Sequence, residues 1–556
     1  MKRLIVSFLF FIAVSFTQTD VSGIISSNTT WSLANSPYIV TGNVLVNEGV
    51  TLSIENGVTV KFDAGTILQI NGELIAQGTD DNKITFTSNA SSPVPGDWGN
   101  IKFTDSSTDA VFDENNNYLS GSIIQYSNIK YGGGSVDAAV IVDGTHPYIE
   151  NNIIAECNAQ GIYASNLGGG DAQLFINKNI ITNNDNTGIR IAVANVSLTI
   201  RITNNTIINN TSSGDAGGIS LTMGGASPAA NAYITNNIIA GNTGNNQGGM
   251  YIQYWTFSLV SIKNNSFYNN YSSQNESGSA IRTYRYHTSY GTSVASHIDD
   301  NIFSNHKGNN LVYFDVGNVS SYLDIDFNGN NYIGNQTDYI IYQSGEASVD
   351  ADSNYWGTVT ESDIQSQIYD WNDDGSLGIV DYDPYLTAPN TDAPISPPTN
   401  LAKQTSGSSV LITWTANPES DVAGYKVHHG NFTGYGYSTS IDAGNVTSYT
   451  LTGVSVDSSI SVTAYDSDAD GTDDQVEGHE SWFAVVSPPL VWHVATTGSD
   501  ETGDGSSETP FATIQKGIDS ASDGDSVLVA AGTYVENINY SGKYITLGSH
   551  LLLHPD

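Results

Sequence analysis

The feature that most constrains this chain is a short motif, Asn followed by apolar residues, that recurs every 23 to 36 residues. The Asn before each apolar step stands at Asn152, Asn179, Asn205, Asn237, Asn265, Asn301, Asn331 and Asn354. A period in this range indicates a solenoid, in which each repeat is one structural unit stacked on its neighbours. Such a fold offers a long surface, so any chemistry must be located on that surface residue by residue.

Each repeat contains short runs in which apolar and polar residues alternate, as in Ile189, Ile191 and Val193 or in Ile200 and Ile202. Alternation with period two predicts β-strands. Gly and Asn separate the runs, and 55 Gly in 556 residues suit a chain that turns often. Asn tolerates the left-handed backbone conformation and bonds to nearby main chain. We therefore predict that the repeated Asn occupy turns and form a ladder inside the coil, and that they do not bind a ligand.

Residues from about 40 to 388 resemble a right-handed parallel β-helix of the pectate-lyase-like superfamily, over about two thirds of the chain. The resemblance rests on the Asn repeats, on the alternating opening from Val50 to Ile70, on Gly-Asp-Trp-Gly at residues 96–99, and on the ending from Asn354 to Pro384. It implies an all-β solenoid. It does not imply one activity, because the superfamily includes lyases, hydrolases, epimerases and non-catalytic surface proteins.

The first residues and the overall charge indicate the compartment. Lys2 and Arg3 precede an apolar run from Leu4 to Phe16, which predicts a secretory signal peptide over residues 1–17, too short to span a membrane. A formal charge of −40 excludes nucleic acid as a partner and favours cations. The single Cys157 excludes an internal disulfide framework. We therefore expect a secreted or cell-surface monomer without a membrane span.

Changes in composition divide the chain after the β-helix, which we place at residues 18–388. A Pro-rich stretch at 389–395 predicts a stiff linker. Short strand-like runs with turns between them predict a small β-sandwich over residues 396–488. Residues 489–556 resemble the entry segment of a second, truncated β-helix, with a short amphipathic helix near Ile514. We expect this segment to be the front part of a longer β-helix, since a solenoid needs several stacked repeats.

The sandwich region resembles a fibronectin type III domain. The residues that carry this resemblance are Pro397, Pro398, Trp414, Tyr425, Leu451–Val454 and Val462–Asp466. The resemblance implies that Trp414 lies in the core and that the domain is a spacer or a binding module. Ser458 and Ser459 stand near the place where the family usually has a corner Tyr, so the hydrogen bond of that Tyr is not expected here.

An acidic run in the same region has the spacing of an EF-hand-type loop. Side-chain oxygens stand at positions 1, 3, 5, 9 and 12, Gly471 is at position 6, and position 7 offers a backbone carbonyl. The pattern predicts a structural Ca²⁺ ion held by Asp466, Asp468, Asp470, Thr472, Asp474 and Glu477. A weaker copy of the pattern comprises Asp370, Asn372, Asp374 and Asp381. The alternative is an acidic, solvated hairpin in the first case and a cap segment in the second.

A stripe of aromatic and cationic residues is the candidate binding surface of the β-helix. Alignment of the strands that follow Gly turns Ile162, Ile189, Ile219 and Ile281 inward and their neighbours outward along one sheet. The outward residues that we predict to bind carbohydrate are Tyr163, Arg190, Tyr251, Gln253, Arg282 and Tyr284. Such side chains can stack on sugar faces and pair with uronate carboxylates. The alternative is an ordinary solvated face.

Two functions remain open at this point. Lyases of the β-helix fold use Lys or Arg as a base, and Arg282, Arg285 and His287 form the basic cluster that could act in this way. The paired Asp and Gly-His-Gly motifs of galacturonan hydrolases are absent from the sequence, as are zinc-spaced His clusters and phosphate-binding loops. We favour an exported, calcium-stabilised modular protein that binds or adheres to a polysaccharide or cell-surface glycan. The alternative is a lyase, or another carbohydrate-active enzyme, that acts on an acidic polysaccharide.

Overall fold

The structure is a computed structural model of the whole chain. It describes residues 18–549 except for the following segments: 170–171, 195, 215, 225–229, 255–258, 273–277, 286–293, 316–322, 407–408, 456–457, 468–474, 485–490, 504, 508, 522–524, 541–542 and 544. The chain divides into two compact units. The β-helix unit comprises Met1–Ser396 with Ala469–Glu480, and the second unit comprises Pro397–Asp468 with Ser481–Asp556.

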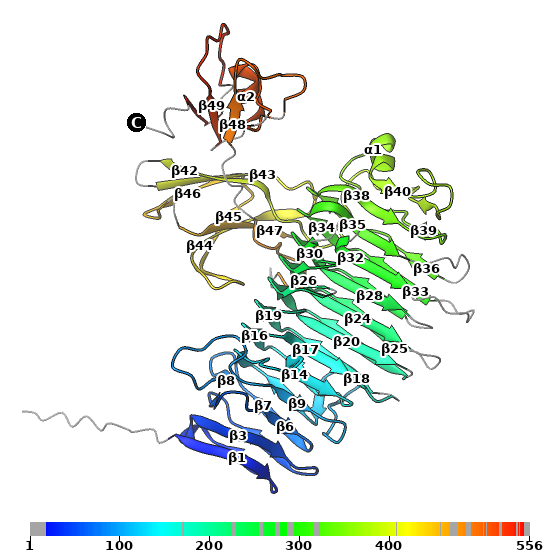
Figure 1. The fold of residues 1–556 in the computed structure, drawn as a ribbon, viewed down its shortest axis with the longest axis vertical. Coiled ribbons are helices and arrows are strands. Elements are labelled where there is room, and N and C mark those ends of the chain that lie inside the picture. Colours follow the sequence, from blue (N-terminus) through cyan, green and yellow to red (C-terminus); the bar gives the residue numbers. More distant parts are fainter. Residues whose placement is uncertain are drawn as a thin grey trace, which may run out of the picture. The chain divides into compact units, whose positions relative to one another are not determined.

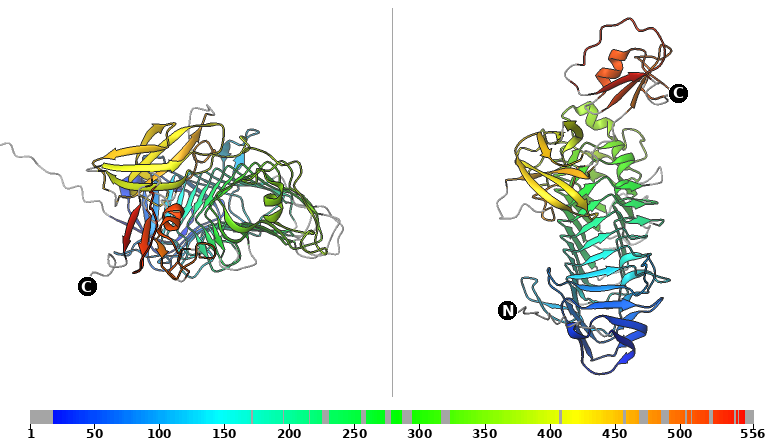
Figure 2. Two further views of the ribbon diagram at one scale, coloured as in Figure 1. Left: turned by 90° about the horizontal axis from the view of Figure 1, so that it is seen from above. Right: turned by 90° about the vertical axis from the view of Figure 1, so that its left-hand side faces the viewer.

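The β-helix unit is a coil with three parallel faces, and each turn of the coil adds one strand to each face. Figure 1 shows these strands stacked in chain order from β1 to β40, and the right-hand view of Figure 2 shows the turns lying one above another. The coil therefore confirms the solenoid that the Asn repeat predicts.

The first and third faces join into one 23-stranded sheet through β1 (Thr19–Ile25) and the long strand β3 (Tyr38–Val46). The strands of the first face are β6 (Leu68–Ile70), β9 (Ile101–Phe103), β14 (Ala138–Asp143), β17 (Gln160–Ser165), β20 (Ile189–Ala194), β24 (Ile219–Gly224), β28 (Met250–Tyr254), β32 (Gly278–Arg285), β35 (Lys307–Asp315), β38 (Gln336–Gln343) and β40 (Ile368–Tyr369). The strands of the third face are β5 (Thr59–Phe62), β8 (Ile84–Ser88), β13 (Ser127–Lys130), β16 (Ile153–Ala155), β19 (Ile180–Thr182), β22 (Thr206–Ile208), β26 (Ile238–Ala240), β30 (Ser266–Tyr268), β34 (Ile302–Ser304) and β37 (Asn331–Ile333).

The second face is a separate 13-stranded sheet. Its strands are β2 (Thr29–Trp31), β4 (Thr51–Ile54), β7 (Glu73–Gln77), β12 (Ile123–Gln125), β15 (Tyr148–Glu150), β18 (Gln173–Asn177), β21 (Leu198–Thr203), β25 (Ala230–Thr235), β29 (Leu259–Lys263), β33 (Val294–Asp299), β36 (Leu323–Asp326), β39 (Val349–Asp350) and β41 (Val380–Asp381). The smaller elements of this unit are η1 (Leu33–Asn35), the hairpin β10 (Val111–Phe112) and β11 (Tyr118–Ser120), the short strands β23 (Thr211–Ser212), β27 (Thr243–Gly244) and β31 (Tyr271–Ser272), and the helix α1 (Glu361–Ser366).

Aliphatic columns fill the interior of the coil. On the first face, Ile162, Ile189, Ile219, Met250 and Ile281 pair in register from strand to strand, and all five are fully buried. The inward positions predicted from the sequence are therefore confirmed. Because strand side chains alternate between faces, their neighbours must lie on the outer surface of the same strands.

The repeated Asn–Asn pairs divide two tasks between them at the corner between the second and third faces. The first residue of a pair, such as Asn204 or Asn236, has a positive φ (56° in both) and turns the chain. The second residue lies inside the coil, where Asn205 donates from both its backbone N–H and its side-chain Nδ2 to Oδ1 of Asn237, at 2.9 and 3.0 Å. Both predicted roles, turn and internal ladder, are therefore present.

The internal ladder at this corner extends over eight turns. Its members are Asn152, Asn179, Asn205, Asn237, Asn265, Asn301, Asn330 and Asn354. The prediction of Asn331 as a member was wrong. Asn331 lies one residue later, in β37 opposite Ile302, because in that turn a second Asn takes the place of the usual first Ile.

One polar side chain interrupts the aliphatic interior and leads to a prediction. Thr283 is inward and buried between Ile252 and Phe314, and its hydroxyl has no hydrogen-bond partner. Thr283→Val keeps the shape of the side chain and removes an unsatisfied polar atom, so we expect a gain of about 1 kcal/mol in the free energy of unfolding. Urea titration measures this change. The matched control is Thr222→Val, in an outward position, for which we expect a change within about 0.5 kcal/mol.

The Pro-rich stretch, which we predict to be a stiff linker, makes hydrogen bonds to the coil. Asn390 donates its backbone N–H to Oδ1 of Asn331 at 2.8 Å, and Ile395 is 1% exposed. Ile395 also donates its backbone N–H to the carbonyl of Gly478 at 3.3 Å. Residues 389–395 thus group with the β-helix unit.

The second unit contains three small sheets. Two are antiparallel and three-stranded, with the strands β42 (Thr399–Ser406), β43 (Ser409–Thr415) and β46 (Ser448–Thr452) in one, and β44 (Val422–Phe432), β45 (Tyr437–Gly444) and β47 (Ile460–Asp466) in the other. Trp414 and Tyr425 pack with ring centroids 5.3 Å apart. The third sheet is parallel and accompanies the helix α2 (Ile514–Ser520); its strands are β48 (Val491–Val494), β49 (Ser526–Val529) and β50 (Thr546–Ser549).

Candidate functional site

The predicted stripe on the first face is one continuous outward column, which we call the face-1 ladder. Strand pairing aligns Tyr163 with Arg190, Arg190 with Ser220, Ser220 with Tyr251 and Tyr251 with Arg282. The predicted alignment of these positions is therefore confirmed. Parallel strands in register place successive members about 4.8 Å apart, so that neighbouring side chains pack on one another.

Gln253 and Tyr284 lie in the next outward column, as predicted, and pair with each other across β28 and β32. The same column contains Thr222 before them and Asp315 after them. Tyr284 and Asp315 therefore stand beside Arg282 on the outer surface. The two columns together bring aromatic, cationic and amide side chains into one strip of the first face.

The face-1 ladder continues beyond Arg282 into three tyrosines that the sequence alignment missed. Tyr313, Tyr342 and Tyr369 follow in register on β35, β38 and β40. Their rings stack face to face, with centroids 5.1 Å and then 4.5 Å apart and interplanar angles of 10° and 1°. Since each ring covers the face of its neighbour, this end of the ladder presents ring edges and hydroxyls rather than open ring faces.

Arg282 caps this tyrosine stack. Its guanidinium carbon lies 5.0 Å from the Tyr313 ring centroid, and its Nη2 lies 2.7 Å from Oδ2 of Asp315. The side chains of Arg282 and Asp315 are 21% and 25% exposed. A cation–π contact and a charge-assisted hydrogen bond together hold the guanidinium in place. Arg282 is thus already paired with a carboxylate.

Arg190 has a different environment from Arg282. Its guanidinium lies over the ring of Tyr163, with the carbon 5.6 Å from the centroid. Among the described residues, no carboxylate forms an ion pair with it. A groove of about 800 Å³ opens beside Tyr163, and small residues of the next two strands, including Ala192, Ala194 and Gly224, contribute to its lining. The Tyr163 ring, which is in contact with the guanidinium of Arg190, therefore borders open space.

The other catalytic candidates are less well defined. Arg285 is the last residue of β32, and the structure does not describe its side chain. His287 lies outside the described residues. The structure therefore describes the side chain of only one member of the predicted basic cluster, Arg282.

The structure describes the two predicted calcium sites to different extents. Asp468, Asp470, Thr472 and Asp474 of the stronger site lie outside the described residues, and the structure describes only its two ends, Asp466 and Glu477. The weaker site, Asp370, Asn372, Asp374 and Asp381, lies among the described residues, and in that part of the chain no three His, Cys, Asp or Glu side chains are arranged to hold a metal ion.

The carboxylates of the weaker site form hydrogen bonds within their own turn. The Asp370 carboxylate is fully buried and accepts the backbone N–H groups of Asn372 and Val380, both at 2.9 Å. Asp374 accepts from the N–H and hydroxyl of Ser376. These hydrogen bonds shape the turn that carries the two carboxylates.

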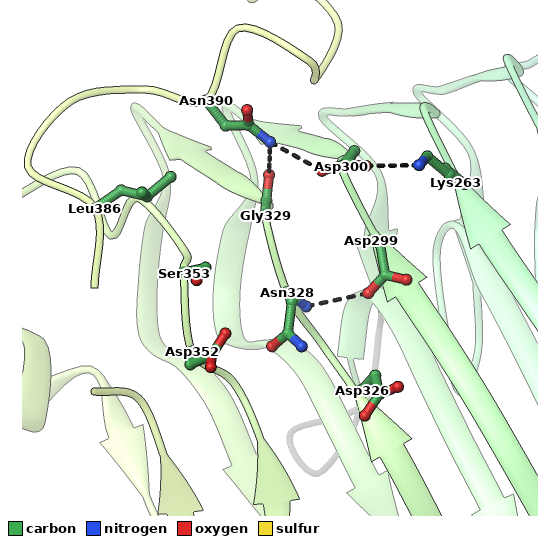
Figure 3. A pocket seen from close by; sticks show the side chains of 10 residues that line it. All are labelled: Lys263, Asp299, Asp300, Asp326, Asn328, Gly329, Asp352, Ser353, Leu386 and Asn390. Carbon is green, nitrogen blue, oxygen red and sulfur yellow. Dashed lines mark hydrogen bonds and ion pairs between the residues drawn. The ribbon is translucent and has the colours of Figure 1, made fainter. Parts of the chain in front are cut away.

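Sequence reasoning also missed an acidic pocket of about 410 Å³ at the corner between the second and third faces (Figure 3). Lys263 and Asp300 form an ion pair of 2.9 Å there, and Asn390 donates to Asp300 at 2.9 Å. Burial raises the pKa of Asp299, which also accepts the backbone N–H of Asn328 at 3.3 Å. Four strands or turns and the 386–390 segment supply this pocket, so no short motif in the sequence could have revealed it.

Residues 23–148 match the family of pectate-lyase-like beta helix domains. This part of the chain is similar to a pectate-lyase-like β-helix. No curated protein matches the chain. Among solved structures, a mutant of a PL6-family alginate lyase aligns over 92% of this chain and 67% of its own, with 13% identity and a TM-score of 0.21. A likeness of that size does not assign an activity to this chain. In the described residues, no helix has the length and apolar character needed to cross a membrane.

Proposed function

We propose that the protein is exported and binds a polysaccharide along the face-1 ladder. The observation that carries the proposal is the register of Tyr163, Arg190, Tyr251 and Arg282 on one outward column, with a groove beside Tyr163. An extended polymer fits a column that repeats at every turn of the coil, because each turn can contact a further part of the polymer. The match of residues 23–148 to a pectate-lyase-like family supports a carbohydrate as the polymer.

The chemistry of the ladder favours an acidic polysaccharide. Arg190 has a planar, permanently charged donor group that can bind a carboxylate through two parallel hydrogen bonds. The cation–π contact with Tyr163 already orders this group, so less side-chain entropy is lost on binding. At the other end, the stacked tyrosines offer hydroxyl groups to sugar oxygens. A uronate near Arg190, followed by further sugars along the tyrosines, fits this arrangement.

Arg190→Ala tests the proposal. We expect at least a tenfold loss of affinity for alginate or polygalacturonate in isothermal titration calorimetry, since tenfold corresponds to about 1.4 kcal/mol. The matched control is Arg201→Ala on the second face, where the guanidinium lies over Phe175 and Tyr233 at 5.6 and 5.0 Å. Both variants lose one positive charge from a cation–π contact. Equal affinities for the two variants would argue against the face-1 ladder as the binding surface.

A polysaccharide lyase remains the second candidate because Arg282, Tyr284 and Asp315 stand together. A lyase base must accept a proton from the sugar, whereas Nη2 of Arg282 already donates a hydrogen bond to Asp315 at 2.7 Å. This pairing favours binding over catalysis. Incubation with acidic polysaccharides, followed by ultraviolet absorbance of the unsaturated product, separates the two functions. Turnover that Arg282→Ala abolishes would overturn the binding-only proposal.

We further propose that residues 396–488 form a fibronectin type III-like spacer stabilised by Ca²⁺ in the loop from Asp466 to Glu477. The two antiparallel sheets and the packing of Trp414 on Tyr425 support the sandwich. The acidic side chains of the loop repel one another without a cation, and Ca²⁺ neutralises them.

Calcium should therefore stabilise the full chain measurably. Binding to the folded state alone contributes about 2.7 kcal/mol at a hundredfold excess over the dissociation constant. We expect a higher unfolding temperature in calcium than in chelator, and loss of most of the difference in Asp470→Asn and Glu477→Gln. Asp374→Asn, in the other acidic loop, is the control and should keep the calcium effect. Unchanged melting curves, with no heat of calcium binding in calorimetry, would leave the loop as an acidic turn.

A further inference from the structure

A second internal ladder runs along the corner between the third and first faces, and one of its members is a histidine. Its successive members are Asn184, Asn210, Asn242, Asn270, His306 and Asn335. The side chain of His306 is fully buried. A titratable ring therefore stands where the neighbouring turns have an amide.

The hydrogen bonds of this ladder all have the same direction. Asn242 donates its backbone N–H and its Nδ2 to Oδ1 of Asn270, at 3.0 and 3.1 Å. Asn270 in turn donates Nδ2 to the carbonyl of Ile239 at 2.7 Å. The amide of Asn270 is thus fixed with its oxygen toward Asn242, and its nitrogen is the group that faces the next turn.

These neighbours select one neutral form of the His306 ring. Nε2 of His306 lies 3.4 Å from Nδ2 of Asn270, which is a donor, so Nε2 must accept. Nδ1 of His306 lies 3.3 Å from Oδ1 of Asn335, which also accepts the backbone N–H of His306 at 3.0 Å. Nδ1 therefore donates. This assignment follows from the donors and acceptors around the ring.

A second proton on the ring has no place in this arrangement. Protonated Nε2 would be a donor facing the donor Nδ2 of Asn270. A flip of the Asn270 amide would restore this contact, but it would break both bonds from Asn242 and the bond to Ile239. The charge would also be buried without a partner, which is strongly unfavourable.

Among the described contacts no charged group compensates for that charge. The titratable residues on β30, β35, β37 and β38 are Tyr268, Lys307, Tyr313, Asp315, Tyr332, Asp338, Tyr339 and Tyr342. Among the described contacts none of them touches the ring, and Lys307 and Asp338 are exposed. Burial lowers the pKa of His306 from 6.5 to about 3, and hydrogen bonds to Asn335 and the Ser304 main chain offset only part of this effect.

The position of His306 links it to the face-1 ladder. The residue stands directly between β34 and β35, and β35 carries Tyr313 and Asp315. We propose that His306 is an acid-sensitive joint, whose protonation opens the β34–β35 turn and releases Asp315 from Arg282. The opening of the turn stands on the ladder geometry alone, and only its effect on glycan binding rests on the function proposed above.

The direction of the pH effect follows from the neutral ring. Because the folded state holds His306 neutral and the open state does not, the open state binds one more proton between pH 6.5 and about 3. The contribution of His306 to stability is complete above pH 6.5 and is lost as the pH falls through that range. One proton corresponds to at most a tenfold change in the opening equilibrium per pH unit.

Hydrogen exchange of the full chain between pH 7 and pH 4.5 tests the opening. His306→Asn restores the residue that the neighbouring turns use and removes the titrating ring. We expect opening of residues 303–315 in the wild type to increase with acid by up to tenfold per pH unit relative to His306→Asn. Identical pH dependence in the two proteins would overturn the proposal.

An internal comparison keeps the test valid if His306→Asn does not fold. In the wild type, Asn210 holds the ladder position equivalent to His306, and residues 207–219 around it contain no histidine. The ratio of the opening of residues 303–315 to the opening of residues 207–219 should rise as the pH falls. A constant ratio would contradict the proposed role of His306. Weaker alginate binding at pH 5 in the wild type but not in His306→Asn would extend the result to the ladder. Acid opening without any alginate binding would contradict the proposed function only.

Discussion

Replacing Asn237 with alanine should lower the free energy of unfolding by about 3 to 6 kcal/mol. Its Oδ1 accepts two bonds from Asn205, and its Nδ2 donates to the carbonyl of Ile202 at 2.8 Å and to Asn265 at 2.9 Å. Each buried polar group that loses its partner costs about 1 to 3 kcal/mol, and at least two such groups would remain. Urea titration followed by far-ultraviolet circular dichroism measures the loss.

The control for this variant is Asn115→Ala, because that side chain is exposed on the hairpin between β10 and β11. We expect a change within about 0.5 kcal/mol for this surface position. A small loss for Asn237→Ala, similar to that of the control, would mean that the internal amides contribute little beyond filling space. In that case the apolar columns alone would hold the coil together.

Trp98→Ala should have an effect of similar size, about 3 to 5 kcal/mol. The Trp98 side chain is fully buried, stacks on Phe62 with centroids 4.1 Å apart, and donates its Nε1–H to the carbonyl of Lys130 at 2.8 Å. Alanine would leave a large cavity and an unpaired carbonyl. Thermal and urea unfolding both measure the loss.

Two further variants separate the causes of the Trp98 effect. Trp98→Phe keeps an aromatic ring against Phe62 but removes the hydrogen bond to Lys130, so we expect an intermediate loss of about 1 to 3 kcal/mol. Trp371→Ala removes the same kind of side chain where it is 54% exposed, and its loss should be the smallest of the three. A different order of losses would contradict the packing role of Trp98.

The coil and the order of residues on the face-1 ladder could be predicted because both depend on repetition. A fixed number of inward positions per turn determines which side chains face outward. The inward positions of Ile189 and Ile219 therefore predict, from the sequence alone, that Arg190 and Ser220 face outward in the same column. The same alignment began each strand after a Gly. It missed Tyr313 and Asp315 because the Gly of β35 lies five residues before Tyr313, which is too far upstream for this alignment.

Contacts between distant segments could not be predicted in this way. Lys263 and Asp300 meet because consecutive turns stack, and Asn390 joins them from a segment that composition alone marks as a linker. Likewise, the spacing of Asp370 and Asp374 fits a calcium loop, yet the Asp370 carboxylate accepts main-chain N–H groups from both ends of its turn. Sequence spacing shows which residues are near one another in the chain, but not which hydrogen-bond partners they have in the fold.

The common direction of the internal hydrogen bonds limits how a chain of this kind can change in length. Asn205 lies 32 residues before its partner Asn237, and Asn210 of the second ladder also lies 32 residues before its partner Asn242. Loss of those 32 residues would join equivalent positions in both ladders at once, whereas loss of one residue more or fewer would put both ladders out of register. Gain or loss of complete turns is therefore the route by which such a protein can match its reach to polymers of different length.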